Sequence, residues 1–230
     1  MTADLSSFAP RVRPDKLHAE GRHVILERIA DEKRFDELYE AFAADAEGAI
    51  WDWLPYGPFA DREAFKAFAR TTYLGGEPCF YAIIPTATGK AAGVASLMRT
   101  DMVNGVTEIG HVCFSPSLQR TPVATEAFYR FMAHVFDDLG YRRFEWKCND
   151  ANVPSKRAAE RLGFVWEGLF RQHLIVKGKN RDTAWFSILD SEWPALKQAF
   201  EAWLDPANSD AEGRQRRSLS EIREGLMPAA

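Results

Sequence analysis

Hydrophobic and polar residues recur with different periods along the chain, and each period predicts an element. Short apolar or alternating runs bounded by turn residues predict strands; they lie at residues 23–29, 79–85, 91–100, 105–114, 142–148, 164–176 and 181–189. Apolar residues spaced three or four positions apart predict helices; they lie at residues 31–45, 61–74, 122–139, 153–163 and 191–204. A capping-box opening predicts one more short helix over residues 218–226.

The order of these elements predicts the fold class. Three consecutive strands between residues 79 and 114 are joined by short polar links, which is typical of an antiparallel meander. Helices inserted between the later strands imply that some neighbours run parallel. We therefore expect one α/β domain with a mixed, partly antiparallel central sheet flanked by helices. It spans residues 23–204, after an N-terminal arm over 1–22 and before a polar C-terminal tail over 205–230.

Composition narrows the classes of partner and compartment. The chain has 230 residues, of which 46% are hydrophobic, so a substantial core can form. A net charge of −4 gives no general attraction for nucleic acid or for an anionic membrane. No run approaches the roughly 18 apolar residues of a membrane span, and no signal peptide core is present. Cys79, Cys113 and Cys148 lie far apart without ligand spacing, so we expect a cytoplasmic protein with no metal site.

One stretch, SPSLQRTPVATEAF over residues 115–128, joins a predicted strand to the long predicted helix. Thr121 stands where an N-cap belongs, and Pro122 stands at the first helical position. The amides of Val123, Ala124 and Thr125 should then point out of the first turn without intrahelical partners. Such a helix end attracts anions, and Arg120 with the Thr121 and Thr125 hydroxyls could add donors for a phosphate or pyrophosphate. An ordinary capped helix start is the alternative.

The surroundings favour the first interpretation. Gln119, Pro122 and Ala124 have the spacing Q-x-x-P-x-A, which resembles the Q/R-x-x-G-x-G/A pyrophosphate loop of the GNAT acyl-CoA N-acyltransferase superfamily. The order of elements over about residues 20–195 is similar too, and residues 107–127 and 149–171 resemble the RimJ/RimL-type branch. The resemblance implies a GNAT-like fold and acetyl-CoA as cofactor. Pro122 and Arg120 replace glycines that are common in the family, which puts tight CoA binding in question.

The resemblance also implies where the cofactor lies. In the family, the strand before the loop splays from its neighbour, and the gap holds the pantetheine arm while the loop and helix hold the pyrophosphate. Residues 112–114, that is Val112, Cys113 and Phe114, would supply a backbone amide for the oxyanion. Asn152 would hold the pantetheine, and Ser155 would donate a hydrogen bond to the departing thiolate. Helix capping alone would also explain Asn152 and Ser155.

Glu108 is our candidate for the base that takes a proton from the amine, because a carboxylate in a partly apolar cleft can have a raised pKa. His111 is the rival. Strict alternation places Glu108 on one face with Gly110 and Val112, and His111 on the other, so both can face one site only if a bulge intervenes. A structural ion pair at Glu108 and a structural role for His111 are the alternatives.

The acceptor should meet the segment IWDWLPYGPF over residues 50–59. There Trp51, Trp53 and Tyr56 surround one acid, Asp52, in a loop between two helices, and they could wall a substrate cleft while Asp52 holds an ammonium group. The same aromatic side chains could instead close one end of the core.

The resemblance implies transfer of an acetyl group from acetyl-CoA to a primary amine by direct attack through a tetrahedral intermediate. The amine would belong to a protein N-terminus, another peptide or a small molecule. A CoA-binding or regulatory module with little turnover is the alternative that Pro122 suggests. The two ends that the resemblance leaves unmatched could pair subunits into a homodimer.

Overall fold

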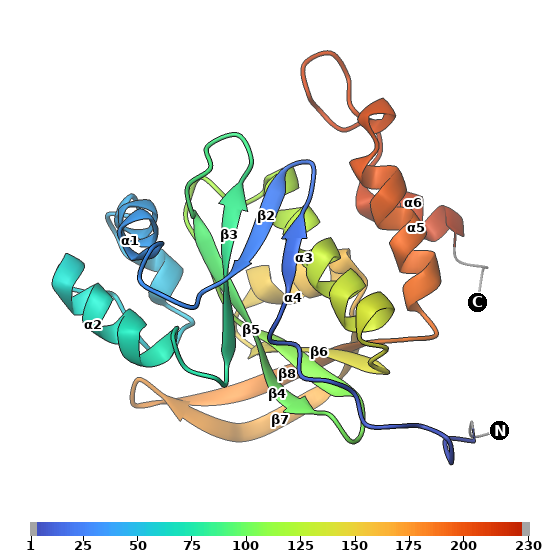
Figure 1. Ribbon diagram of the computed structural model, residues 1–230, viewed down its shortest axis with the longest axis horizontal. Coiled ribbons are helices and arrows are strands. Elements are labelled where there is room, and N and C mark those ends of the chain that lie inside the picture. Colours follow the sequence, from blue (N-terminus) through green and yellow to red (C-terminus); the bar gives the residue numbers. More distant parts are fainter. Residues whose placement is uncertain (1–3, 227–230) are drawn as a thin grey trace.

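The computed structural model describes residues 4–226, which form one mixed sheet with helices on both faces (Figure 1). Within that range the strands are β1 (His18–Glu20), β2 (Val24–Arg28), β3 (Cys79–Pro85), β4 (Gly93–Asp101), β5 (Val106–Phe114), β6 (Arg143–Asn149), β7 (Val165–Val176) and β8 (Lys179–Leu189). Their order in the sheet is β1-β2-β3-β4-β5-β6-β8-β7. β5 and β6 are parallel and the other neighbours are antiparallel, which confirms the predicted fold class.

The helices follow the predicted order. They are α1 (Phe35–Ala43), α2 (Arg62–Thr72), α3 (Pro122–Ala133), α4 (Val153–Leu162), α5 (Trp193–Leu204) and α6 (Leu219–Leu226), with short turns η1 (Ala49–Trp51), η2 (His134–Asp138) and η3 (Pro206–Asn208). Local chemistry sets several boundaries. Asp61 Oδ1 accepts a hydrogen bond from the Ala64 amide at the start of α2, and Gly163 ends α4 with a left-handed φ of 99°. None of the helices in the described range is long and apolar enough to cross a membrane.

Two apolar layers cover the sheet. One joins the sheet to α1 and α2 and contains Phe35, Phe65, Tyr73 and Phe80. The other joins the sheet to α3, α4, α5 and α6. Figure 1 shows α1 and α2 on one side of the sheet and α3 to α6 on the other. Strand positions therefore alternate between two helix-covered faces, and this makes the face on which a side chain lies decisive for the site.

Two details differ from the sequence prediction. Residues 18–20, which we placed in the N-terminal arm, form the edge strand β1 and pair with β2. Three residues are too few to show a strand period, so the pattern carried no signal. The long helix is α-helical only to Ala133 and continues as the π-helical turn η2, before Gly140 adopts a left-handed φ of 65°. The predicted helix after Ser218 is present as α6.

Candidate active site

β5 and β6 separate halfway along their length. Their parallel pairing runs from Val106 opposite Arg143 to Ile109 opposite Trp146 and stops there. Beyond this point β5 remains paired only with β4, and β6 remains paired only with β8. The main-chain groups that β5 turns toward β6 after Ile109 therefore lack a strand partner on that side. This is the strand separation that the family resemblance implied.

A β-bulge lies where the splay begins. The register with β4 passes from Ser96 opposite Gly110 to Val94 opposite Cys113, so β5 carries one extra residue, and His111 has a left-handed φ of 50°. The extra residue turns His111 toward the α1–α2 face, where its ring packs against Tyr56 and Phe80. Strict alternation was therefore wrong for this strand.

After the bulge, Glu108 and His111 lie on the same face of β5. Met98 is the neighbour of Glu108 across the β4–β5 pair and lies on the same side of the sheet as Phe80. Val112, which alternation grouped with Glu108, instead packs against the apolar layer under α3. Both candidate bases therefore line the same cavity.

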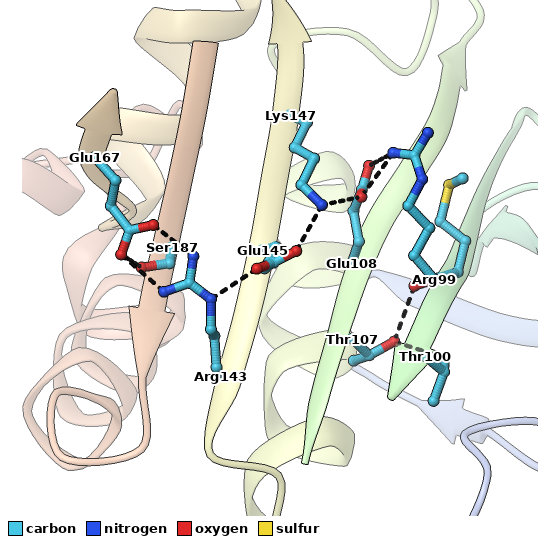
Figure 2. A network of polar contacts seen from close by, with 10 residues as sticks. Arg99, Thr100, Thr107, Glu108, Arg143, Glu145, Lys147, Glu167 and Ser187 are labelled. Carbon is cyan, nitrogen blue, oxygen red and sulfur yellow. Dashed lines mark hydrogen bonds and ion pairs between the residues drawn. The ribbon is translucent and has the colours of Figure 1, made fainter. Parts of the chain in front are cut away.

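Glu108 belongs to a row of alternating charges that runs across four strands, from Arg99 on β4 to Glu167 on β7 (Figure 2). Its side chain is 4% exposed, and its Oε2 lies 2.9 Å from both Arg99 Nη1 and Lys147 Nζ. Lys147 also pairs with Glu145, which pairs with Arg143. Glu108 is therefore an ion-paired carboxylate, and its surroundings are not the partly apolar cleft that the sequence suggested.

We call the opening between β5 and β6 the splay cavity. It has a volume of about 270 Å³. Predicted site residues that line it are Trp53, Glu108, His111, Val112, Asn152 and Ser155. Ser155 Oγ accepts a hydrogen bond from Trp146 Nε1 at 3.0 Å, so its own hydrogen can be donated elsewhere. Asn152 Oδ1 caps α4 by accepting from the Ser155 amide, which leaves its amide nitrogen available as a donor.

The imidazole of His111 is neutral near pH 7. Burial, with a smaller contribution from the charges of Arg99 and Arg181, lowers the pKa of His111 to about 4. Its Nδ1 lies 3.1 Å from the Tyr56 hydroxyl, and the two rings are stacked with an interplanar angle of 9°. A neutral imidazole held in this way can accept a proton through one ring nitrogen.

We expect this histidine to make folding pH-dependent. The unfolded chain binds a proton at His111 near pH 6.5, while the folded chain binds it only near pH 4, so stability should fall as the pH drops from about 7 to 4. Between pH 7 and pH 4.5 the loss of stability from this residue should be about 2 kcal/mol. Urea unfolding of the wild type and His111→Phe at pH 7 and pH 4.5 tests this. Equal losses in the two proteins would show that His111 does not contribute.

A second opening, the α3 cavity, lies at the start of α3. It has a volume of about 540 Å³, which lies within the usual range of roughly 300–1,000 Å³ for ligand pockets. Predicted site residues that line it are Phe114, Gln119, Arg120, Thr121, Ala124 and Thr125. On β5, Phe114 of this lining is two positions along the chain from Val112, which lines the splay cavity. On α4, Pro154 of this lining is next to Ser155, which also lines the splay cavity. The two cavities therefore adjoin along β5 and the start of α4.

The first turn of α3 offers fewer free amides than the sequence suggested. Thr121 is the N-cap, and its hydroxyl accepts from the Ala124 amide at 3.3 Å and donates to the Leu118 carbonyl. The Thr125 amide donates to the Thr121 carbonyl at 3.4 Å. The expectation of no intrahelical partner was therefore wrong for the Thr125 amide. The Ala124 amide has no intrahelical partner, as expected, but the cap engages it. Arg120 adopts a left-handed φ of 59°, which explains why a glycine suits this position.

The sequence prediction missed several lining residues of the α3 cavity, among them Arg161, Trp203 and Gln215. Arg161 of α4 donates from Nη1 to Thr125 Oγ1 at 3.2 Å, and its guanidinium lies over the Trp203 ring at 5.2 Å. Burial lowers the pKa of Arg161, and among residues 4–226 no carboxylate forms an ion pair with it. Trp203 and Gln215 close the same cavity from α5 and the C-terminal tail. A partly buried cation without a carboxylate partner suits a bound phosphate.

Comparison with known proteins agrees with this geometry. The sequence profile of the family described as "Acetyltransferase (GNAT) domain" matches residues 23–165, more than half of the chain. The crystal structure of a GCN5-related N-acetyltransferase from Brucella melitensis is 50% identical, with a TM-score of 0.93 over 96% of this chain and 100% of that one. The chain belongs to the GNAT acetyltransferase family.

Curated relatives match over shorter stretches. A putative ribosomal N-acetyltransferase, YdaF of Bacillus subtilis, is 30% identical over 47% of this chain and 59% of its own length. The ribosomal-protein-serine acetyltransferase of Escherichia coli is 30% identical over 44% of this chain and 56% of its own length. This GNAT protein thus spans about half to two thirds of the length of the curated relatives it matches. GNAT acetyltransferases use acetyl-CoA.

The remaining predicted residues of this GNAT protein lie outside both linings. Val123 packs beside the core under α3, and Cys113 is buried on the α1–α2 face. Trp51 is buried in the same layer, edge-on to Phe42, whereas Asp52 is exposed. Of the aromatic segment, Trp53 lines the splay cavity, and Tyr56 reaches the site through its contact with His111.

Proposed function

We propose that this protein transfers an acetyl group from acetyl-CoA to a primary amine. The observation that carries the proposal is the adjacency of the two cavities. A cavity at the start of α3 that is lined by Arg120 and Arg161 adjoins the cavity at the β5–β6 splay, and both lie on β5 and α4. A cofactor with a charged end and a thioester end requires such a pair of neighbouring sites.

The residues present fit acetyl-CoA, which supplies the acetyl group activated as a thioester. Arg161, with the Thr125 hydroxyl, would hold the diphosphate, and Arg120 would add charge at the cavity mouth. The Thr121 hydroxyl is already engaged by the Leu118 carbonyl and the Ala124 amide, so it has no hydrogen to donate to a phosphate. The Val123 amide has no intrahelical partner at its position in the first turn and would add a donor. Pro122 removes no donor that the helix itself would use, but it removes one first-turn amide that the diphosphate could bind, and the charge of Arg120 would compensate for that loss.

At the other end, Asn152 would hold the pantetheine arm, and the hydroxyl of Ser155 would donate to the sulfur as the thiol leaves. Main-chain N–H groups of residues 112–114 that face the splay would stabilise negative charge on the carbonyl oxygen. The splay leaves β5 unpaired on that side. A main-chain amide can fill this role whatever its side chain is. The separation of β5 from β6 is therefore what indicates the position of these donors.

His111 would accept the proton that the amine loses, because its imidazole is neutral and faces the cavity. Glu108 would have an electrostatic role. It holds Arg99 and Lys147 beside the cavity, and their charge disfavours the ammonium form of an acceptor. Tyr56 would fix the ring of His111 through the 3.1 Å contact.

For the acceptor we propose a peptide amine, with an N-terminal serine as the first candidate. The support is the resemblance to relatives named ribosomal N-acetyltransferase and ribosomal-protein-serine acetyltransferase. Such a substrate would place the reaction in the cytoplasm.

Thiol release from acetyl-CoA tests the proposal. We expect a peptide with a free N-terminal serine to raise the release above the hydrolysis background, and the same peptide with a blocked N-terminus to leave it unchanged. Ser155→Ala should lower kcat by about tenfold while CoA still binds, because one hydrogen bond to the leaving sulfur is lost. Mass spectrometry of the peptide should show the added acetyl group. CoA binding without transfer to any amine in a panel would instead support a binding module.

A further inference from the structure

One cation of the splay cavity has no counter-ion in the part of the chain that the structure describes. Arg181 lies on β8 and lines the cavity, and its Nε is buried without a hydrogen-bond partner. Among residues 4–226 no carboxylate lies within ion-pair distance of its guanidinium, whereas Arg99 and Lys147 both pair with Glu108. A buried donor of a charged group that stays unpaired costs free energy, so a ligand that pairs with it gains that energy on binding.

The charges around Arg181 leave the cavity positive. Its lining contains three cations, Arg99, Lys147 and Arg181, and one carboxylate, Glu108. Glu145 lies nearby, but it is engaged by Lys147 and Arg143 (Figure 2). His111 is neutral near pH 7 and adds no charge there. The excess of positive charge is therefore carried by Arg181.

The position of Arg181 suits contact with the acceptor. The β7–β8 hairpin that carries it is tied to the aromatic loop by a hydrogen bond of 2.9 Å from Lys177 Nζ to the Trp51 carbonyl. The same cavity is also lined by Ile50, Trp53, Leu54 and Pro55 from the aromatic segment, which carry no charge. The α3 cavity, which would hold the phosphates, has its own cations in Arg120 and Arg161. Arg181 thus stands apart from the residues that would bind the diphosphate.

We propose that Arg181 binds a carboxylate of the acceptor, so that the preferred substrates are amines that carry an acidic group close to the reacting nitrogen. A guanidinium binds a carboxylate through paired N–H donors, and the buried Nε supplies one of them. The inference rests on the proposed function, because it takes the splay cavity as the acceptor site. The carboxylate can come from an acidic side chain near a peptide N-terminus or from the main chain of a free amino acid.

Matched acceptors test this inference. The peptides are amidated pentapeptides with aspartate or its isostere asparagine at the first, second or third position, and free serine is compared with serinamide. In the wild type we expect that, at one of the three positions, the aspartate peptide has a kcat/KM about tenfold higher than that of the matching asparagine peptide. A preference for the aspartate peptides would identify an acidic side chain as the source of the carboxylate, and a preference for serine over serinamide would identify the main chain of a free amino acid.

Variants assign the preference to Arg181. Arg181→Gln should reduce the ratio between acidic and neutral acceptors to about one, and Arg181→Lys should keep part of it because the charge remains. Arg171→Gln removes one charge from an exposed position on β7 outside the cavity, so it should keep the full ratio. An equal loss of turnover on both members in Arg181→Gln would place the residue in the transfer step and overturn the inference.

Binding separates this inference from the proposed function. Titration calorimetry with each peptide pair in the presence of CoA gives a ratio of dissociation constants that needs no turnover. If no peptide is acetylated but the aspartate member binds about tenfold more tightly and Arg181→Gln removes that difference, the inference stands and the proposed function fails. No preference in the wild type, in either rate or binding, would overturn the inference while leaving acetyl transfer possible.

Discussion

Arg161→Glu should weaken binding of CoA by about 100-fold, since it replaces a charged donor with a negative charge where we place the diphosphate. Arg161 is held for this role by Thr125 Oγ1 and by the Trp203 ring, and no carboxylate competes for it among the described residues. A factor of 100 corresponds to about 2.7 kcal/mol, which lies within the range for hydrogen bonds to charged groups. Arg161→Gln, which removes the charge without reversing it, should cost about tenfold.

Isothermal titration of CoA into each variant at one fixed ionic strength provides the measurement, because exposed charges are screened by salt. Arg171→Glu is the matched control. It makes the same change of charge at an exposed position on β7 outside the α3 cavity. Its CoA affinity should stay within about twofold of the wild type. Equal losses in the two variants would show that the diphosphate does not contact Arg161. Thermal unfolding of each variant checks that α4 remains packed.

Glu108→Gln should lower the free energy of unfolding by about 3 kcal/mol at pH 7. Glu108 and Lys147 have side chains that are 4% and 5% exposed, so the change leaves a buried ammonium with Glu145 as its remaining partner. Arg99 also loses its carboxylate. Breaking a buried ion pair at one partner is costly because the other charge stays desolvated.

Urea unfolding measures this loss, and Glu167→Gln serves as the control at the exposed end of the same row of charges (Figure 2). Its cost should be below about 1 kcal/mol because solvent screens the pair. Similar small losses in both variants would mean that Glu108 is not a structural anchor. A folded Glu108→Gln protein that binds CoA but has lost transfer, beside an active His111→Asn protein, would make Glu108 the base.

The fold was predictable because the signals are local. Helical spacing between strands requires crossovers, and short polar links require hairpins, so the mixed sheet follows from the order of elements. Asp61, Thr121 and Asn152 mark helix starts by their own chemistry, and the structure shows each as an N-cap. The three-residue strand β1 has no such local signal, and only its pairing with β2 defines it.

The site was predictable only in part because its decisive features depend on packing. The bulge at His111 is one extra residue in a strand whose composition is otherwise regular, and its position is set by pairing with β4. The pairing of Glu108 with Lys147 depends on the parallel register of β5 and β6, which no local pattern encodes. Arg161 and Arg181 resemble ordinary surface arginines in the sequence. Only the fold shows that neither has a carboxylate partner among residues 4–226.

The central claim is that the start of α3 holds the diphosphate of CoA while the β5–β6 splay holds its thiol end. A crystal structure of the complex with CoA tests it most directly. The account predicts phosphate oxygens beside Thr125 and Arg161 in the α3 cavity, with the pantetheine arm running toward Ser155. CoA bound elsewhere, with the α3 cavity closed by side chains, would contradict it.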